Sequence, residues 1–300
     1  MTGTDAFGLT PLAGGHSGET FVADAAGERT VVRVYAARSA RRGPDAPVVD
    51  AAVLRLVRGL LPVPDVLEVQ RARPEVDAPG LLVTSFLPGT RLDLLLPGLS
   101  AARRVAVGRG LGVLLARIAM MPMPRSGRFV DDALRVEPFA EADLVALVQA
   151  HRVGTGIATW PAKAYDALLG VTDRAQVLLD EIDRTCLVHS DLNPKNLLVD
   201  PVTLEVTGLV DWEFAHAGTP GLDLGNLLRF ERDPAFADAV LSAYRHDVVD
   251  AGRDVLDQAR AADLFALVDL AGRRGENPVT EQAHDLLTAI ARSGDLHASA

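Results

Sequence analysis

One segment, Leu187 to Asp211, constrains the fold of this 300-residue chain more than any other. It reads LVHSDLNPKNLLVDPVTLEVTGLVD, in which short apolar runs at 187–188, 197–199 and 206–210 favour short strands. Asp200-Pro201 is typical of a turn between the last two runs. Between the strands lie four polar residues with the spacing of a catalytic loop: His189, Asp191, Asn196 and Asp211.

These residue types suit phosphoryl transfer. That reaction needs a group that orients the attacking hydroxyl and accepts its proton, and oxygen ligands for the Mg²⁺ that neutralises phosphate charge. Asp191 fits the first task, and Asn196 and Asp211 fit the second with one amide and one carboxylate oxygen. The alternative interpretation treats Asp191 and Asn196 as ordinary turn residues. His189 is expected to pack and hydrogen-bond so that the loop keeps its shape.

The first third of the chain alternates glycine-containing turns with β-prone runs, which is typical of antiparallel hairpins. Apolar residues recur at helical spacing between Val49 and Leu60, with Asp45 as a possible N-cap and Pro47 in the first turn. One helix is therefore expected within a set of strands. The expected strands are 9–12, 20–23, 30–35, 66–69 and 81–87.

The chain becomes mainly helical after residue 100. Helical patterns cover about 100–121, 137–151 and 161–184, and helices resume after the strand-like island around the catalytic segment. The sequence thus predicts an α+β protein, and its length fits either one large domain or two lobes that share a cleft. A small antiparallel β-sheet lobe with one helix spans 1–88, and a mainly helical lobe with the catalytic loop spans 89–300.

Composition limits the partners. The net charge of −10 leaves no excess of positive charge for a nucleic acid backbone, so no nucleic acid partner is expected. Arginines interrupt the apolar stretch 101–121, and the N-terminus lacks a basic start followed by an apolar run, so neither a membrane anchor nor a secretory signal is expected. We expect a cytoplasmic protein. Cys186 is the only cysteine and is expected to be a plain buried thiol.

The segment HSDLNPKN followed by VDWE resembles the aminoglycoside phosphotransferase and choline kinase family, whose loop typically reads His-Gly-Asp-Leu-x-x-x-Asn. The resemblance extends to GTPGLDL, where Gly218, Pro220, Asp223 and Leu224 match a Gly-x-Pro-x-x-Asp-Leu turn. It implies a protein-kinase-like fold and an ATP-dependent small-molecule kinase that uses Mg²⁺, with GTP as a possible donor. In it Asp223 would cap a helix and brace the catalytic loop.

The same resemblance implies a nucleotide site in the first lobe. The segment LAGGHSGETF is similar to a loop that covers phosphates, with Gly15 and Ser17 as contacts. Arg33 stands where the family usually has a lysine that contacts phosphate. The only lysines of the chain, Lys163 and Lys195, lie outside the first lobe, so Arg33 is the candidate for this role. Asp50 stands where the acidic ion-pair partner of this cation is expected. Adenine would meet the backbone near Ser85 to Leu87.

The substrate is expected to be a small molecule, because only about a dozen residues separate Asp211 from Asp223 and leave no room for a long peptide-binding segment. Glu231 and Asp233 fall where the family often places acids that meet substrate amino groups, although an exposed charge pair is the alternative. The leading candidate is a cationic aminoglycoside-like antibiotic. A choline, ethanolamine, homoserine or sugar kinase and a nucleotide-binding pseudokinase are the alternatives.

Overall fold

The computed structural model describes residues 8–12, 20–25, 27–36, 42–139, 143–231, 233–248, 251–252 and 254–299. As far as they are described, the residues form two compact units, each built from segments that are separated in sequence. Unit 1 contains Met1–Leu99, Arg128–Glu137 and Pro194–Ala215, and unit 2 contains Ser100–Gly127, Pro138–Asn193 and His216–Ala300. The division of the chain after residue 88 stays a prediction, and the units themselves alternate along the chain.

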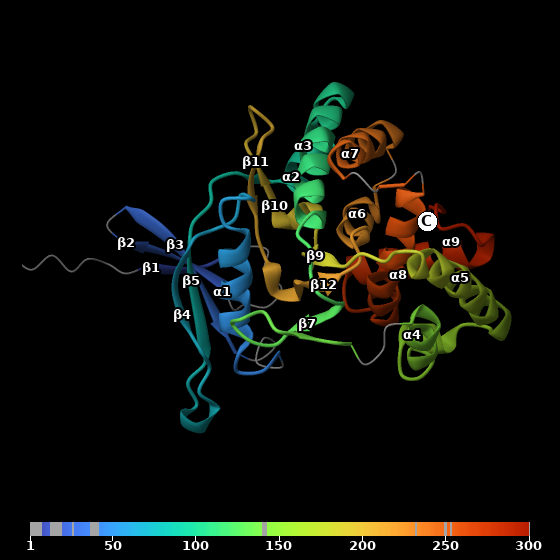
Figure 1. The fold of residues 1–300 in the computed structure, drawn as a ribbon, viewed down its shortest axis with the longest axis horizontal. Coiled ribbons are helices and arrows are strands. Elements are labelled where there is room, and N and C mark those ends of the chain that lie inside the picture. Colours follow the sequence, from blue (N-terminus) through green and yellow to red (C-terminus); the bar gives the residue numbers. More distant parts are fainter. Residues whose placement is uncertain are drawn as a thin grey trace, which may run out of the picture. The chain divides into compact units, whose positions relative to one another are not determined.

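Unit 1 is organised around a five-stranded antiparallel sheet in the order β1-β2-β3-β5-β4 (Figure 1). Its strands are β1 (Gly8–Pro11), β2 (Thr20–Ala25), β3 (Glu28–Tyr35), β4 (Val66–Gln70) and β5 (Gly80–Ser85). Helix α1 (Ala46–Val57) packs on β4 and β5, and its buried residues include Val49, Val53 and Val57. Asp45 precedes α1 as expected but makes no side-chain cap, because its carboxylate pairs with Arg71.

A second, three-stranded sheet in unit 1 has the order β11-β10-β6 and brings the segment 194–215 into this unit. It comprises β6 (Thr90–Arg91), β10 (Leu197–Val199) and β11 (Val206–Leu209), and α2 (Leu92–Leu95) packs beside it. Gly89 has a φ of 141°, and a Cβ there would lie 2.5 Å from Thr207 Oγ1. Only glycine therefore allows the turn after β5 to pass so close to β11.

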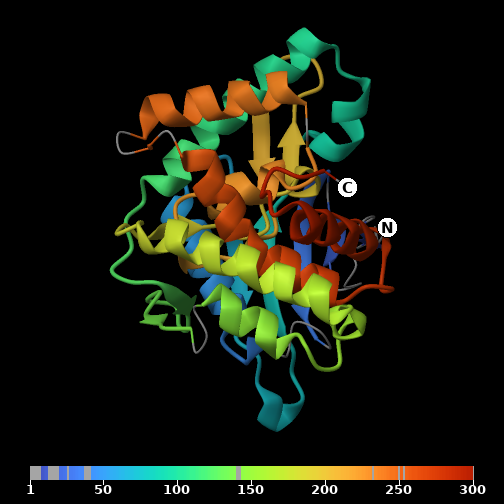
Figure 2. The same cartoon turned by 90° about the vertical axis from the view of Figure 1, so that its right-hand side faces the viewer.

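Unit 2 is mainly helical, and its helices lie against one another in layers (Figure 2). They are α3 (Ala101–Ala119), α4 (Leu144–Ala150), α5 (Ala162–Asp180), α6 (Leu222–Leu228), α7 (Pro234–Asp247), α8 (Val255–Gly272) and α9 (Pro278–Ser293). A core that includes Leu168, Leu264, Val268 and Leu287 joins α4, α5, α8 and α9. The short strands β9 (Cys186–Val188) and β12 (His216–Gly218) pair antiparallel within this unit.

One expected helix begins later than the sequence predicted. Glu137, expected near a helix start, belongs to β8 (Val136–Glu137), which pairs with β7 (Gly127–Phe129) and bonds to Arg128. The helix α4 starts only at Leu144, where Asp143 caps it by accepting a hydrogen bond from the N–H of Ala146. No helix among the described residues is both long and apolar enough to cross a membrane.

Candidate active site

Unit 1 holds the two residues assigned to the metal. In the β10–β11 ladder Leu197 lies opposite Leu209. Next to this pair, the Val210 N–H donates a hydrogen bond of 3.0 Å to the Asn196 carbonyl. Asn196 and Asp211 therefore lie at the same end of one two-stranded ribbon. Asp211 adopts a left-handed backbone with a φ of 65°, which aspartate tolerates better than most residues and which is common at functional turns.

This pair fits Mg²⁺ by the chemistry of its donors. Mg²⁺ in nucleotide enzymes is usually bound by one or two carboxylates together with phosphate oxygens and water, not by a complete protein cage. The Asp211 side chain is 39% exposed, and only its Oδ1 is bonded within the described residues. Asp211 thus offers a partly exposed carboxylate, and Asn196, a largely buried residue with an amide side chain, belongs to the same end of the ribbon.

Arg33 on β3 reaches the segment after β11. Its Nη1 donates to Asp211 Oδ1 at 2.8 Å, and its Nη2 donates to Glu213 Oε2 at 2.5 Å. Burial lowers the pKa of Arg33, but Coulombic attraction to Asp211 and Glu213 outweighs it, so the pKa lies above its ordinary value. The guanidinium therefore stays charged and balances two carboxylates.

The expected ion pair between Arg33 and Asp50 is wrong. Asp50 is buried on α1 and instead accepts from Tyr35 Oη at 2.6 Å and from Arg42 at 2.8 and 2.6 Å. The physical reason is that Arg42, only eight residues from Asp50, forms a bidentate pair with its carboxylate. Arg33 is bonded instead to Asp211 and Glu213.

The remaining nucleotide assignments lie at the end of β5 and in the glycine-rich loop. Ser85 N donates to the Asp65 carbonyl, and Ser85 Oγ accepts from Asp65 N, both at 2.9 Å. The Ser85 N–H is thus committed to the fold, and an adenine contact in the rest of the segment 85–87, including Leu87, stays a prediction. Gly15 and Ser17 lie outside the described residues.

Unit 2 holds the catalytic loop after β9. The half-buried Asp191 receives a 2.8 Å hydrogen bond on Oδ1 from Asn193 Nδ2, which fixes the carboxylate rotamer. His189 is completely buried, and its Nδ1 accepts from the N–H of Asp191 at 3.2 Å, so the ring supports the loop from inside. Ser190 between them has a φ of 66°, a conformation that explains why related loops favour glycine there.

Asp223 lies in the first turn of α6 but makes no cap there, so the expected helix cap is wrong; its carboxylate is bonded to the backbone of this loop instead. Its two carboxylate oxygens accept from His189 N at 2.8 Å and from Ser190 N at 2.7 Å. Burial raises the pKa of Asp223 to about 7. The two N–H donors favour the charged form and lower the pKa, but their effect is smaller than that of burial. The carboxylate thereby holds the two residues that precede Asp191.

The acids expected near a substrate are engaged in local structure. Asp233 caps α7 by accepting from Ala235 N at 3.0 Å, and Glu231 Oε1 accepts from Asp233 N at 2.8 Å. Arg104 on α3 lies 4.0 Å from the Glu231 carboxylate and 3.7 Å from that of Asp233. These two acids are thus a helix cap with its own counter-ion.

Sequence reasoning missed three residues that order the site. Asn193 orients Asp191, and its place in the turn two residues after an aspartate was an available signal. Glu213 binds Arg33 from 180 residues away, and no local pattern indicates such a partner. Arg229 at the end of α6 pairs twice with the buried Asp263 of α8 at 2.9 and 2.6 Å, which ties α6 to the helical core.

Comparison with known proteins places the chain in a class. Residues 8–260 match the family model of the phosphotransferase enzyme family, APH. Because this match covers most of the chain, the chain belongs to that family. The predicted α+β, protein-kinase-like fold is confirmed.

Solved structures of similar fold come from aminoglycoside phosphotransferases. The GDP complex of aminoglycoside 2'-phosphotransferase-IIIa has a TM-score of 0.71 at 16% identity, with 97% of this chain and 94% of that one covered. The ternary complex of APH(4)-Ia with ADP and hygromycin B has a TM-score of 0.67 at 19% identity, covering 96% and 94%. A putative aminoglycoside phosphotransferase from Ralstonia eutropha has a TM-score of 0.68 at 17% identity, covering 97% and 92%.

A curated relative is acyl-CoA dehydrogenase family member 10 of Mus musculus, which is 26% identical over 172 residues. The match covers 55% of this chain but only 15% of the mouse protein. The chain therefore corresponds to a small part of that longer relative.

Proposed function

We propose that this phosphotransferase moves the γ-phosphate of ATP, with GTP as the alternative donor, to a hydroxyl of a small molecule. The observation that carries the proposal is the ordered carboxylate of Asp191, which Asn193 orients and which follows a backbone held by Asp223. The nucleotides named in the related complexes, ADP and GDP, support a nucleotide donor without choosing between adenine and guanine.

In this proposal Asp191 accepts a hydrogen bond from the attacking hydroxyl and takes its proton as the oxygen attacks the γ-phosphorus, while the bond from that phosphorus to the bridging oxygen breaks and the nucleoside diphosphate leaves. Because Asn193 fixes the rotamer of Asp191, the carboxylate needs little reorganisation when the substrate arrives. Asn196 and Asp211 would hold Mg²⁺, which supplies neutralisation of the phosphate charge that develops during transfer. Arg33 is the cation assigned to the phosphates.

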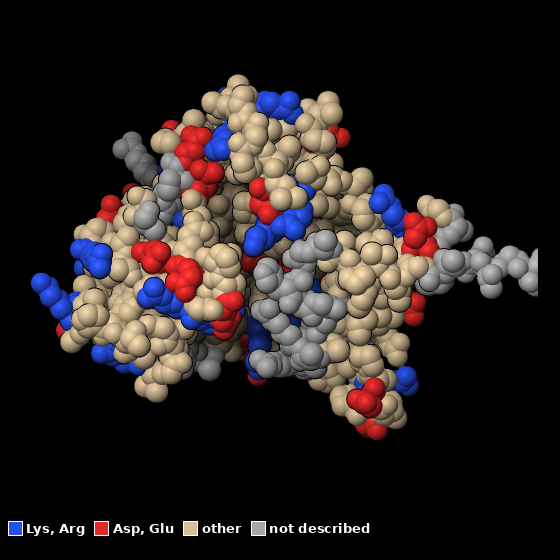
Figure 3. Space-filling view, turned by 180° about the vertical axis from the view of Figure 1, so that it is seen from behind, with Lys and Arg blue, Asp and Glu red and all other residues tan. Residues whose placement is uncertain are grey.

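For the substrate, we propose a cationic aminoglycoside-like antibiotic as the first candidate. It is supported by hygromycin B, which is bound together with ADP in the ternary complex of APH(4)-Ia, a protein of similar fold. The acidic net charge of −10 also favours approach of a cation. On the face shown in Figure 3, acidic and basic side chains of the described residues are interspersed, so this charge is not gathered into one patch there.

A metabolic small-molecule kinase, for an amino alcohol, homoserine or a sugar, is the second candidate, and one observation favours it. Glu231 and Asp233 are committed to capping α7 and lie close to Arg104. A polycationic substrate would have to replace Arg104 as their counter-ion, whereas a neutral or singly charged substrate would not.

A screen of the purified protein for release of ADP, or of GDP when GTP is the donor, tests the proposal and separates the candidates. Aminoglycosides form one arm, and choline, ethanolamine, homoserine and hexoses form the other, each with ATP or GTP and Mg²⁺. With the acceptor found in this way, Asp191→Asn should bind nucleotide as the wild type does and lose turnover. Near-normal phosphorylation by Asp191→Asn would refute the assigned mechanism, and silence with every aminoglycoside would refute the first candidate.

A further inference from the structure

The partners of Arg33 differ in how firmly they are held. Both Glu213 and Arg33 are largely buried, with side chains 16% and 14% exposed, whereas Asp211 is 39% exposed. Each carboxylate takes a different arm of the guanidinium. Asp211 is also assigned to the metal, so of these two carboxylates Glu213 is the one that has no second task in the proposed reaction.

We propose that Glu213 is a positioning residue for the nucleotide, because it anchors Arg33 in the place expected of Asp50. This inference rests on the proposed function, in which Arg33 meets the phosphates of the donor. The carboxylate that anchors Arg33 is thus assigned to Glu213, two residues after Asp211, and not to Asp50 on α1.

The local fold prepares Glu213 for this role. Glu213 is the middle residue of the 3₁₀-helix η6 (Trp212–Phe214), which begins directly after Asp211 and packs against α1. The adjacent Trp212 is 4% exposed, and its indole N–H donates to the Leu209 carbonyl at 3.1 Å. Because Trp212 fixes η6, the Glu213 carboxylate is held in place before any ligand binds.

Arg33 in this arrangement retains an unused donor. Its Nε is buried and has no hydrogen-bond partner among the described residues, while its Nη1 and Nη2 are bonded. A buried N–H without an acceptor costs free energy, which an anionic ligand oxygen would recover. Glu213 and Asp211 thus hold the two terminal nitrogens of the guanidinium, and Nε is the donor that they leave unpaired among the described residues.

Asp50 does not compete for the role. Its carboxylate is 4% exposed, and three hydrogen bonds join it to Tyr35 and Arg42. These contacts connect β3 and the segment before α1 with the helix itself, so Asp50 supports the fold of unit 1. The two carboxylates can therefore be separated by experiment.

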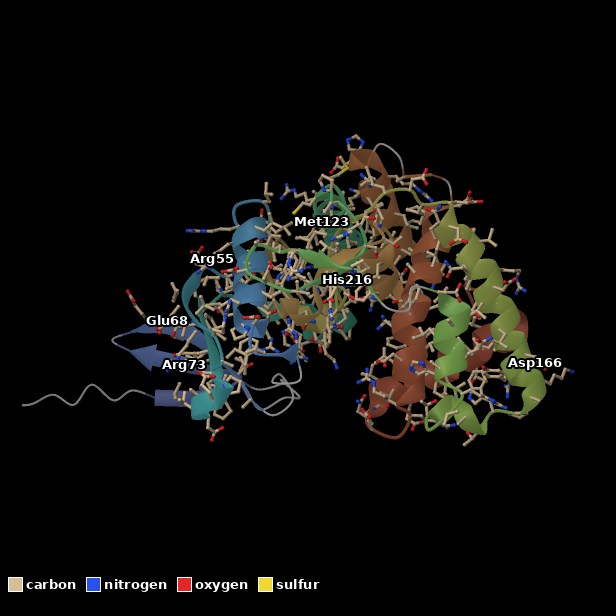
Figure 4. The ribbon with its side chains drawn as sticks, turned by 60° about the horizontal axis from the view of Figure 1, so that its bottom comes forward. Arg55, Glu68, Arg73, Met123, Asp166 and His216 are labelled. Atoms are coloured by element: carbon tan, nitrogen blue, oxygen red, sulfur yellow. The ribbon has the colours of Figure 1, made fainter. Side chains whose placement is uncertain are left out.

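The test measures nucleotide affinity of the whole chain by calorimetry, without acceptor, for ATP and GTP, with and without Mg²⁺. Glu213→Gln keeps the size of the side chain but removes the charge, and the matched control Glu68→Gln removes the same charge from β4, where Glu68 is exposed and projects away from the sheet (Figure 4). We expect Glu213→Gln to weaken binding about tenfold, the effect of one charge-assisted hydrogen bond, and Glu68→Gln to bind as the wild type does.

A double-mutant cycle shows whether Glu213 acts through Arg33. In an Arg33→Gln background, Glu213→Gln should cause little further loss, because the guanidinium that it positions is gone. A merely structural role of Glu213 would weaken binding equally in both backgrounds. If Glu213→Gln does not fold, Glu213→Asp keeps the charge but shortens the reach, and it should bind nucleotide more weakly than the wild type.

The outcomes separate the two proposals. Nucleotide binding by the wild type with no difference between Glu213→Gln and Glu68→Gln, or with wild-type affinity in Glu213→Asp, would overturn the inference and leave the proposed function standing. An equal loss in both Arg33 backgrounds, or a larger loss in Asp50→Asn than in Glu213→Gln, would also overturn it alone. A wild type that binds neither nucleotide would refute the proposed function as well.

Discussion

Replacing Asp223 by alanine should destabilise the protein severely, because it removes the acceptor of two buried N–H groups. The bonds from His189 N and Ser190 N are 2.8 and 2.7 Å long, and Asp223 is 2% exposed, so water cannot easily replace the carboxylate. Each orphaned buried donor costs about 1–3 kcal/mol, which gives about 2–6 kcal/mol in total. Domains of this kind have a total stability of about 5–15 kcal/mol.

Urea unfolding followed by circular dichroism measures this loss as a change in the free energy of unfolding. Asp223→Asn is the matched variant: it retains one acceptor oxygen but turns an amide N–H toward the second donor, so an intermediate loss is expected. A loss below about 1 kcal/mol in Asp223→Ala would show that the carboxylate does not satisfy these donors in solution.

The pH dependence provides a second readout of the same carboxyl. Its pKa is raised from 3.8 to about 7 in the folded protein, so the folded state binds the proton more tightly than the unfolded chain does. The resulting stabilisation is full below about pH 3.8 and is lost as the pH rises to about 7. The free energy of unfolding of the wild type, minus that of Asp223→Asn, should therefore fall across this window. A flat difference would refute the raised pKa.

Three further changes test the surrounding structure. Ser190→Gly should raise the free energy of unfolding by about 0.5–1 kcal/mol in urea titrations, because it relieves the left-handed backbone at φ 66° while giving up some chain entropy; a loss of stability would contradict this. Gly225→Ala should lower the free energy of unfolding by about 1–3 kcal/mol, because the new Cβ would meet the Ala259 carbonyl oxygen. Gly110→Ala, at a helix position with open space around it, should raise the free energy of unfolding by up to about 1 kcal/mol. Similar thermal midpoints for these two variants would refute the close packing of Gly225 against Ala259. Burial lowers the pKa of His284, whose Nε2 accepts from Trp160, so stability should fall as the pH drops below about 6.5, and His284→Gln should reduce that slope in a pH series of melting curves.

The sequence predicted the elements whose signal is local. The strands around Arg33 and the catalytic loop follow β-prone runs bounded by turn residues, and α1 follows its apolar spacing, so each is found within a few residues of its expected place. The start of α4 was missed because Glu137 belongs to β8, which pairs with β7, and apolar residues at helical spacing begin only with Leu144 and Val148.

The pairing of charges was beyond the reach of sequence patterns. Arg33 and Asp50 had suitable types and spacing, but the choice among carboxylates depends on three-dimensional distance, and Glu213 lies 180 residues from Arg33 in sequence. The competing cation Arg42 then satisfied Asp50 from a short distance along the chain. The motif allowed Asp191, Asn196 and Asp211 to be named from the sequence, but it did not indicate which residues form long-range ion pairs.

The alternating segments of the two units have a consequence for synthesis on the ribosome. Strand β6 forms its ladder with β10, and β10 pairs with β11, so the three-stranded sheet of unit 1 cannot close until residue 209 has left the exit tunnel. By then the helices α3 to α5 of unit 2 have already emerged. The nascent chain must therefore keep an unfinished β-sheet from aggregating while a different unit begins to fold, and a fragment ending at residue 99 would lack the strands that complete its own unit.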